Sequence, residues 1–208
     1  MKTILCYGDS NTHGTAPLPA PGVDLRHGPG DRWPDAMAAG LGAGIRVIDE
    51  GLPGRTTVHD DMVEGGMRNG ATVLPAILHS HKPIDVMVLM LGTNDLKTRF
   101  SVSAWEIARS VERLGLMAQA ENVVQDIVLV SPAPVREIGA LQEVFAGAET
   151  RQQGLNGFIE AAAKRHGWGY VDAAAHVEVS PTDGVHWEPD AHRRFGAHMA
   201  MVVAGRLG

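Results

Sequence analysis

The chain has 208 residues, of which 44% are hydrophobic and 20% charged, a composition typical of one globular domain rather than a disordered chain. The formal net charge is −6, and without a cluster of basic residues this argues against a nucleic-acid partner. A single cysteine, Cys6, excludes an internal disulfide. No apolar run reaches the length of a membrane helix, and the chain enters an apolar segment almost at once without a signal peptide. We therefore expect a cytoplasmic protein with no membrane partner.

Short apolar runs alternate with segments of helical periodicity along the whole chain. The runs predict strands at 4–7, 45–48, 85–91, 127–130 and 170–171. The segments between and after them predict helices at 33–41, 69–79, 103–120, 155–165 and 189–207. Because such alternation favours a parallel sheet covered on both faces, we expect an α/β fold, a three-layer α/β/α sandwich with a five-stranded parallel sheet, forming a single domain over 1–208.

Two segments are longer than ordinary connections in such a fold. Residues 15–31 are rich in Pro and Gly, and residues 131–147 carry an apolar patch around Phe145. We expect both to lie at the functional edge of the sheet as pocket walls or subunit contacts, and plain surface loops are the alternative. The patch around Phe145 favours a homo-oligomer.

The first strand ends abruptly in Gly8, Asp9 and Ser10. In open α/β sheets ligands bind at the carboxyl ends of the strands, so the Ser10 hydroxyl is a candidate nucleophile. The alternative is that Asp9 and Ser10 only cap the following helix.

Gly54 follows the second predicted strand and Asn94 follows the third. A backbone N–H at Gly54 and the side-chain amide of Asn94 could both donate hydrogen bonds to an oxyanion at this edge. Taken singly, each residue is as well explained by an ordinary turn or cap.

Asp183 and His186 lie three residues apart in a glycine-containing loop before the last predicted helix. Such a loop can bring the carboxylate to one imidazole nitrogen and turn the other nitrogen toward Ser10, as a general base requires. A turn with a surface histidine is the alternative. Together these segments supply every group that acyl transfer needs.

In order and spacing these four segments resemble the conserved blocks of the SGNH (GDSL-type) hydrolases, and the stretches VIDEGLPGRTT, LMLGTNDLK and DGVHW are most similar to the arylesterase/acyltransferase branch. The resemblance implies a flavodoxin-like SGNH hydrolase fold with Ser10, Asp183 and His186 as catalytic triad. It also implies an oxyanion hole formed by the backbone N–H groups of Ser10 and Gly54 and the side chain of Asn94. The branch resemblance likewise favours a homo-oligomer.

Four further residues near these segments are candidates for binding substrate. Asn11 stands where the family's commonest motif has Leu, a departure beside the nucleophile that we expect to affect specificity. His13, Arg55 and Trp187 are the others, with surface exposure, an ion pair and core packing as their respective alternatives. His79 and His81 have no nearby set of carboxylates, so we predict no metal site.

The resemblance implies a serine esterase that hydrolyses short-chain acyl or aryl esters through an acyl-enzyme, with acyl transfer where another alcohol replaces water. The expected partner is a small-molecule ester, and no cofactor is needed. A carbohydrate acetylesterase of the same fold is the alternative within the family. Outside the family, the alternative is a flavodoxin-like ligand-binding module without catalysis. The chain lacks G-x-G-x-x-G, and Asp183 and His186 would have no role in such a module.

Overall fold

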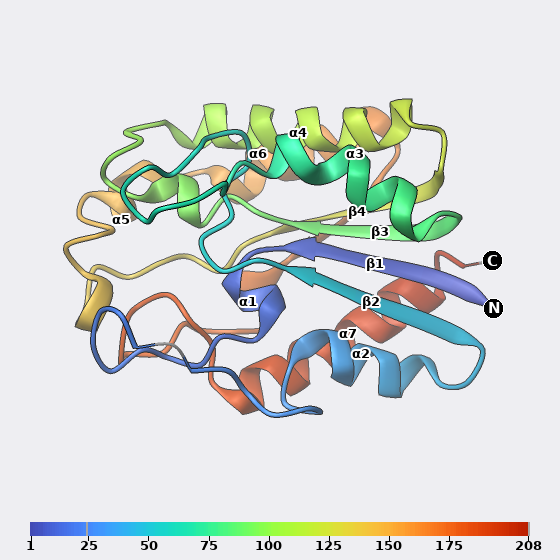
Figure 1. The fold of residues 1–208 in the computed structure, drawn as a ribbon, viewed down its shortest axis with the longest axis horizontal. Coiled ribbons are helices and arrows are strands. Elements are labelled where there is room, and N and C mark those ends of the chain that lie inside the picture. Colours follow the sequence, from blue (N-terminus) through green and yellow to red (C-terminus); the bar gives the residue numbers. More distant parts are fainter. Residues whose placement is uncertain (24, 208) are drawn as a thin grey trace.

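The computed structural model describes residues 1–23 and 25–207, so Asp24, within the predicted loop 15–31, and Gly208 lie outside the described residues. The described strands form one parallel sheet in the order β2-β1-β3-β4-β5 (Figure 1). They are β1 (Lys2–Gly8), β2 (Ile45–Gly51), β3 (Ile84–Met90), β4 (Val124–Ser131) and β5 (Gly169–Asp172). This is the strand order of flavodoxin-like sheets, and it confirms the predicted fold class.

Helices cover both faces of the sheet (Figure 1). The helices of one face are α3 (Gly70–His81), α4 (Ala104–Ala120) and α6 (Leu155–His166), and those of the other are α2 (Trp33–Leu41) and α7 (Pro189–Ala204). The shorter helices are α1 (Ser10–His13), α5 (Ala148–Arg151) and the 3₁₀ turns η1 (Asn94–Leu96), η2 (Gly139–Leu141) and η3 (Ala173–Ala175). Among the described residues, no helix combines the length and hydrophobicity needed to cross a membrane.

The predicted helices agree closely with the structure, and the differences at their ends have local causes. Helix α3 begins at Gly70 rather than at residue 69 because the side chain of Asn69 caps it, accepting a hydrogen bond from the Ala71 N–H at 3.0 Å. Helix α7 ends at Ala204, three residues before the expected end, with Gly205 as its C-cap.

Two apolar cores follow from the alternation of side chains along the strands. On β1, Leu5 and Tyr7 pack against α3 and α4, whereas Ile4 and Cys6 face α2 and α7, and all four are fully buried. A strand covered on both faces buries the side chains of both, which is why four consecutive residues of β1 are hydrophobic.

The order of the strands reverses at β1, because β2 and β3 lie on its two sides. The segments that follow these three strands therefore meet at one edge, on the left in Figure 1. In open α/β sheets this switch point is where ligands bind.

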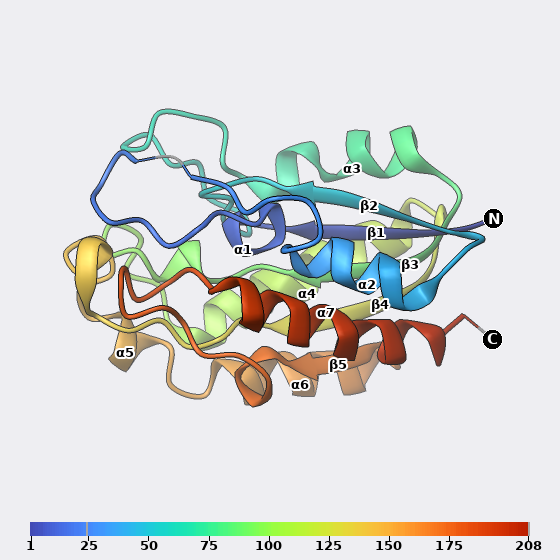
Figure 2. The ribbon, with the colours of Figure 1, turned by 90° about the horizontal axis from the view of Figure 1, so that it is seen from below.

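Helices α2 and α7 lie side by side on one face of the sheet (Figure 2), and Gly196 permits their close approach. A Cβ atom on Gly196 would lie 2.5 Å from the Cβ of Ala36 and 2.5 Å from the carbonyl oxygen of Trp33. We expect Gly196→Ala to lower the free energy of unfolding by about 1–3 kcal/mol, measured by urea denaturation.

Gly157→Ala on α6 is the matched control, because a Cβ there would meet nothing within 4 Å. Its better helix propensity should raise stability by up to about 1 kcal/mol. Equal effects of the two substitutions would show that the α2–α7 contact does not depend on a glycine.

Candidate active site

Ser10 begins the one-turn helix α1 directly after β1. The Asp9 carboxylate caps this turn by accepting a hydrogen bond from the Asn11 N–H at 3.0 Å, and Gly14 ends it in the left-handed conformation. Ser10 is 5% exposed. Its hydroxyl is therefore fixed at the carboxyl edge of the central strand.

His186 lies between Ser10 and Asp183. Its Nδ1 is 2.6 Å from Asp183 Oδ2, and its Nε2 is 3.0 Å from Ser10 Oγ. An ionised carboxylate can only accept, so Nδ1 carries the proton and Nε2 is the acceptor for the serine hydroxyl. This is the geometry that a general base needs in order to remove the Ser10 proton.

The Asp183 carboxylate is held by backbone groups as well. Its Oδ1 accepts from the N–H groups of Val185 and His186, both at 2.9 Å, and its Oδ2 accepts from the Leu18 N–H at 2.7 Å. Burial alone would raise the pKa of Asp183, but the hydrogen bonds from His186 and Leu18 outweigh it and hold that pKa below its usual value. Asp183 thus remains ionised and orients the imidazole.

Gly54 and Asn94 face the same edge from the neighbouring strands. Residues 52–55 form a tight turn closed by the Arg55 N–H bond to Leu52 O at 3.0 Å, and Gly54 takes its third position with φ of +81°. A type II turn requires this positive φ, which favours glycine. The Asn94 amide donates to the carbonyl oxygen of Arg55 at 3.1 Å, which ties it to the turn.

Ser10, Gly54, Asn94 and His186 line one cavity of about 650 Å³. Both long loops contribute walls to it, which confirms that they lie at the functional edge. The apolar lining residues are Leu18, Pro21, Val23, Leu52, Pro53, Leu141, Val144, Phe145 and Val185. Phe145 is only 2% exposed, so the apolar patch that favoured a homo-oligomer is turned into this wall and the core.

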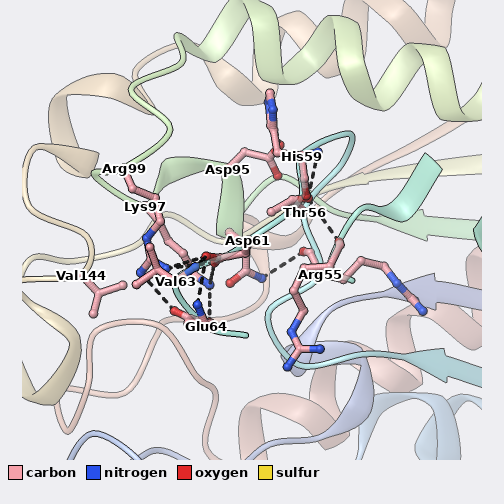
Figure 3. A network of polar contacts seen from close by, with 12 residues as sticks. Arg55, Thr56, His59, Asp61, Val63, Glu64, Asp95, Lys97, Arg99 and Val144 are labelled. Atoms are coloured by element: carbon pink, nitrogen blue, oxygen red, sulfur yellow. Dashed lines mark hydrogen bonds and ion pairs between the residues drawn. The ribbon is translucent and has the colours of Figure 1, made fainter. Parts of the chain in front are cut away.

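A network of charges forms another wall of the cavity (Figure 3). Fully buried Asp61 accepts from Lys97 Nζ at 3.1 Å and from Arg99 Nη1 at 2.8 Å. Glu64 accepts from the same two side chains, at 2.6 Å from Lys97 and 3.2 Å from Arg99. Because the paired residues are 33 to 38 positions apart, sequence periodicity carried no signal for this network. The ion pairs of this network link the segment between β2 and α3 to the segment that follows Asn94.

Four residues were expected to contact substrate: Asn11, His13, Arg55 and Trp187. In the part of the chain that the structure describes, none of them lines this cavity. Arg55 is buried, donates from Nη1 to the carbonyl oxygens of Gly8 (2.9 Å) and Glu50, and stacks 4.2 Å above the ring of Tyr7. Figure 3 shows its guanidinium pointing away from the charged network. Arg55 therefore joins β1 to β2 instead of facing a ligand.

The other three residues have similar structural contacts. Asn11 donates from its amide to Val185 O at 3.2 Å, which ties α1 to the loop of His186. Trp187 is 1% exposed and packs edge-on against Phe195. His13 Nδ1 lies 3.2 Å from Thr15 Oγ1. In the structure, Asn11 and Trp187 therefore hold the segments that carry the site in place and do not line the cavity.

Comparisons with known proteins find similar chains over nearly the full length. Residues 6–194 match the GDSL-like lipase/acylhydrolase family model. Est24, a carbohydrate acetylesterase from Sinorhizobium meliloti, is 33% identical with a TM-score of 0.92, over 99% of both chains. The native M. smegmatis aryl esterase is 32% identical with a TM-score of 0.91, over 100% of both chains. A putative arylesterase from Agrobacterium tumefaciens is 32% identical with a TM-score of 0.86 over the same extent. No curated protein matches the chain.

Asp9 is buried directly beside the nucleophile. Burial raises the pKa of Asp9 to about 6, opposed by the Asn11 N–H and by the His186 ring. The folded protein therefore holds this proton more tightly than the unfolded chain, and the stability that the proton contributes is lost as pH rises through about 6.

We expect the free energy of unfolding of the wild type, relative to Asp9→Asn, to fall by about 2 kcal/mol between pH 4 and pH 7. Asn at this position can still accept from the Asn11 N–H but does not titrate. Urea unfolding of both proteins at several pH values measures the difference. A difference that stays constant with pH would contradict the raised pKa.

Proposed function

The chain belongs to the GDSL-like lipase/acylhydrolase family and is a carboxylic ester hydrolase, and on that premise we propose that it cleaves small aryl or short-chain acyl esters with Ser10 as nucleophile. The observation that carries the proposal is the hydrogen-bonded chain from Ser10 Oγ through His186 to Asp183 at the cavity.

In the proposed reaction, Ser10 Oγ attacks the ester carbonyl carbon while His186 Nε2 takes the hydroxyl proton. The imidazolium that forms is stabilised by the Asp183 carboxylate at 2.6 Å. As the tetrahedral intermediate collapses, the bond to the alcohol oxygen breaks and His186 returns the proton to that oxygen. Water, or a second alcohol in acyl transfer, then attacks the acyl-Ser10 ester by the same steps.

The oxyanion of each intermediate would be bound by the N–H groups of Ser10 and Gly54 and by the amide of Asn94. An amide nitrogen has two hydrogens, and in Asn94 one of them is directed to the Arg55 carbonyl. That bond orients the side chain and leaves the second hydrogen for the oxyanion. Such preorganised donors act most strongly where water is excluded.

The cavity supports a small substrate. A volume of about 650 Å³ lies in the range that binds compact organic ligands, and the apolar residues from the two long loops suit an aromatic ring or a short acyl chain. The likeness to an aryl esterase over the full chain supports the same choice.

A carbohydrate acetylesterase is the second candidate. The charged side chains on the cavity wall, Glu64, Arg68, Lys97 and Arg99, could bind sugar hydroxyl groups. Two of the similar structures are described as carbohydrate acetylesterases. Acetyl xylan and acetylated monosaccharides, tested beside aryl acetates, distinguish the two candidates.

Association of several copies stays a proposal. In support, Met62, Val63 and Met67 expose most of their apolar surface on the segment between β2 and α3. The cytoplasmic location stays a prediction from the sequence.

Hydrolysis of 4-nitrophenyl esters from acetate to long chains tests the proposed function. We expect wild type to prefer the short esters and Ser10→Ala to lose at least about 10³-fold in kcat. Long-chain preference would contradict the small substrate, and activity retained by Ser10→Ala would exclude Ser10 as nucleophile. No hydrolysis by folded wild type would favour the ligand-binding module.

Asn94→Ala tests the oxyanion hole. Loss of one donor should lower kcat by about 10²–10³-fold with little change in KM. Asn156→Ala on α6 is the matched control, since it also deletes an amide that donates at 3.0 Å, here to Asp172, away from the cavity. A kcat as high in Asn94→Ala as in the control would remove Asn94 from the mechanism.

A further inference from the structure

Arg68 is a cation of the cavity wall that the ester-hydrolysis chemistry does not use. Its backbone is fixed, because its carbonyl oxygen accepts from the Thr56 N–H at 2.9 Å and from Thr56 Oγ1 at 3.2 Å. Its side chain lies against two glycines. A Cβ atom on Gly54 would come within 3.0 Å of Arg68 Nε, and one on Gly66 within 3.0 Å of Nη1. The guanidinium thus lies beside the glycine proposed to bind the oxyanion.

Within residues 1–23 and 25–207, the guanidinium of Arg68 has no hydrogen-bond or ion-pair partner, and its Nε is buried. The neighbouring carboxylates do not pair with the Arg68 guanidinium. Lys97 and Arg99 share the carboxylates of Asp61 and Glu64, so the charges of these four side chains cancel. Among the described residues of this wall, the Arg68 charge remains as an excess of one positive charge.

A buried donor without a partner is costly, and a guanidinium presents its donors in a plane that fits a carboxylate. We propose that Arg68 binds a carboxylate carried by the substrate, so that the preferred esters are monoanions. This assignment rests on the proposed function, since it names the class of ester that the same cavity accepts. The apolar wall from the two long loops would hold the uncharged part of the ester.

Matched pairs of esters test the assignment. 4-Acetoxybenzoate and 4-acetoxybenzamide place the charge, or its neutral counterpart, on the leaving group. The 4-nitrophenyl monoesters of adipic acid and of its monoamide place it on the acyl group. We expect the wild type to favour the anionic member of at least one pair in kcat/KM, and Arg68→Gln to reduce that preference by about 10- to 100-fold.

Two variants separate recognition from net charge. Arg68→Lys keeps the charge but loses the planar pair of donors, so an intermediate preference is expected. Arg46→Gln removes one charge from an exposed position near the start of β2, at the opposite end of the sheet, and should keep the wild-type preference. Equal preferences in wild type and Arg68→Gln, for both pairs, would overturn the assignment.

A binding measurement on the wild type alone is independent of catalysis and of whether a variant folds. 4-Acetamidobenzoate and 4-acetamidobenzamide are amide analogues of the first ester pair. Isothermal titration should show the anion binding about 10-fold or more tightly, and equal binding of the two would count against a carboxylate site. Hydrolysis of the neutral 4-acetoxybenzamide that depends on Ser10 would uphold the proposed function even if both charge comparisons fail.

Discussion

The imidazole of His186 is held between two oxygens, and the rest of the site is arranged around that ring. Asp183 lies three residues before it in the chain, whereas Ser10 is separated from it by 176 residues. The hydrogen bonds are useful for catalysis only if both partners are rigid. The Asp183 carboxylate is fixed by backbone N–H groups, one of them from Leu18 in the first long loop, and Ser10 is fixed at the end of a fully buried strand. The bonds of His186 to Ser10 and of Asp183 to Leu18 therefore join the N-terminal segment to the segment before α7.

The strand order brings the remaining parts of the site together. Since β2 and β3 flank β1, the residues that follow these strands, Gly54, Ser10 and Asn94, lie at one edge. The loop of Asp183 and His186 comes just before α7 in the chain, and α7 packs on α2 (Figure 2). Four segments far apart in sequence thus contribute to one cavity, and the residues behind them, among them Arg55, hold the segments in register.

The fold could be predicted from sequence because its signals are local. Apolar runs and helical periodicity depend on each segment alone, and so does the break at Gly8 after the first strand. The direction of a side chain that follows a turn depends on contacts distant in the sequence. For Arg55 the sequence left substrate binding and an ion pair open, whereas the structure shows hydrogen bonds to the carbonyl oxygens of Gly8 and Glu50. The network of Asp61, Lys97 and Arg99 could not be predicted either, because its residues meet only once the sheet has formed. For Trp187 the sequence had also offered core packing, and its edge-on contact with Phe195 of α7 agrees with that alternative.

Covalent labelling of the nucleophile tests the central claim, that Ser10 is activated by the His186–Asp183 pair. Diethyl 4-nitrophenyl phosphate transfers its phosphoryl group to an activated serine with loss of 4-nitrophenolate. After incubation, intact-mass measurement and peptide mapping should find one diethylphosphoryl group, on Ser10, in the wild type. They should find almost none in His186→Ala over the same time. Labelling of another residue, or equal labelling of Ser10 in the two proteins, would contradict the account.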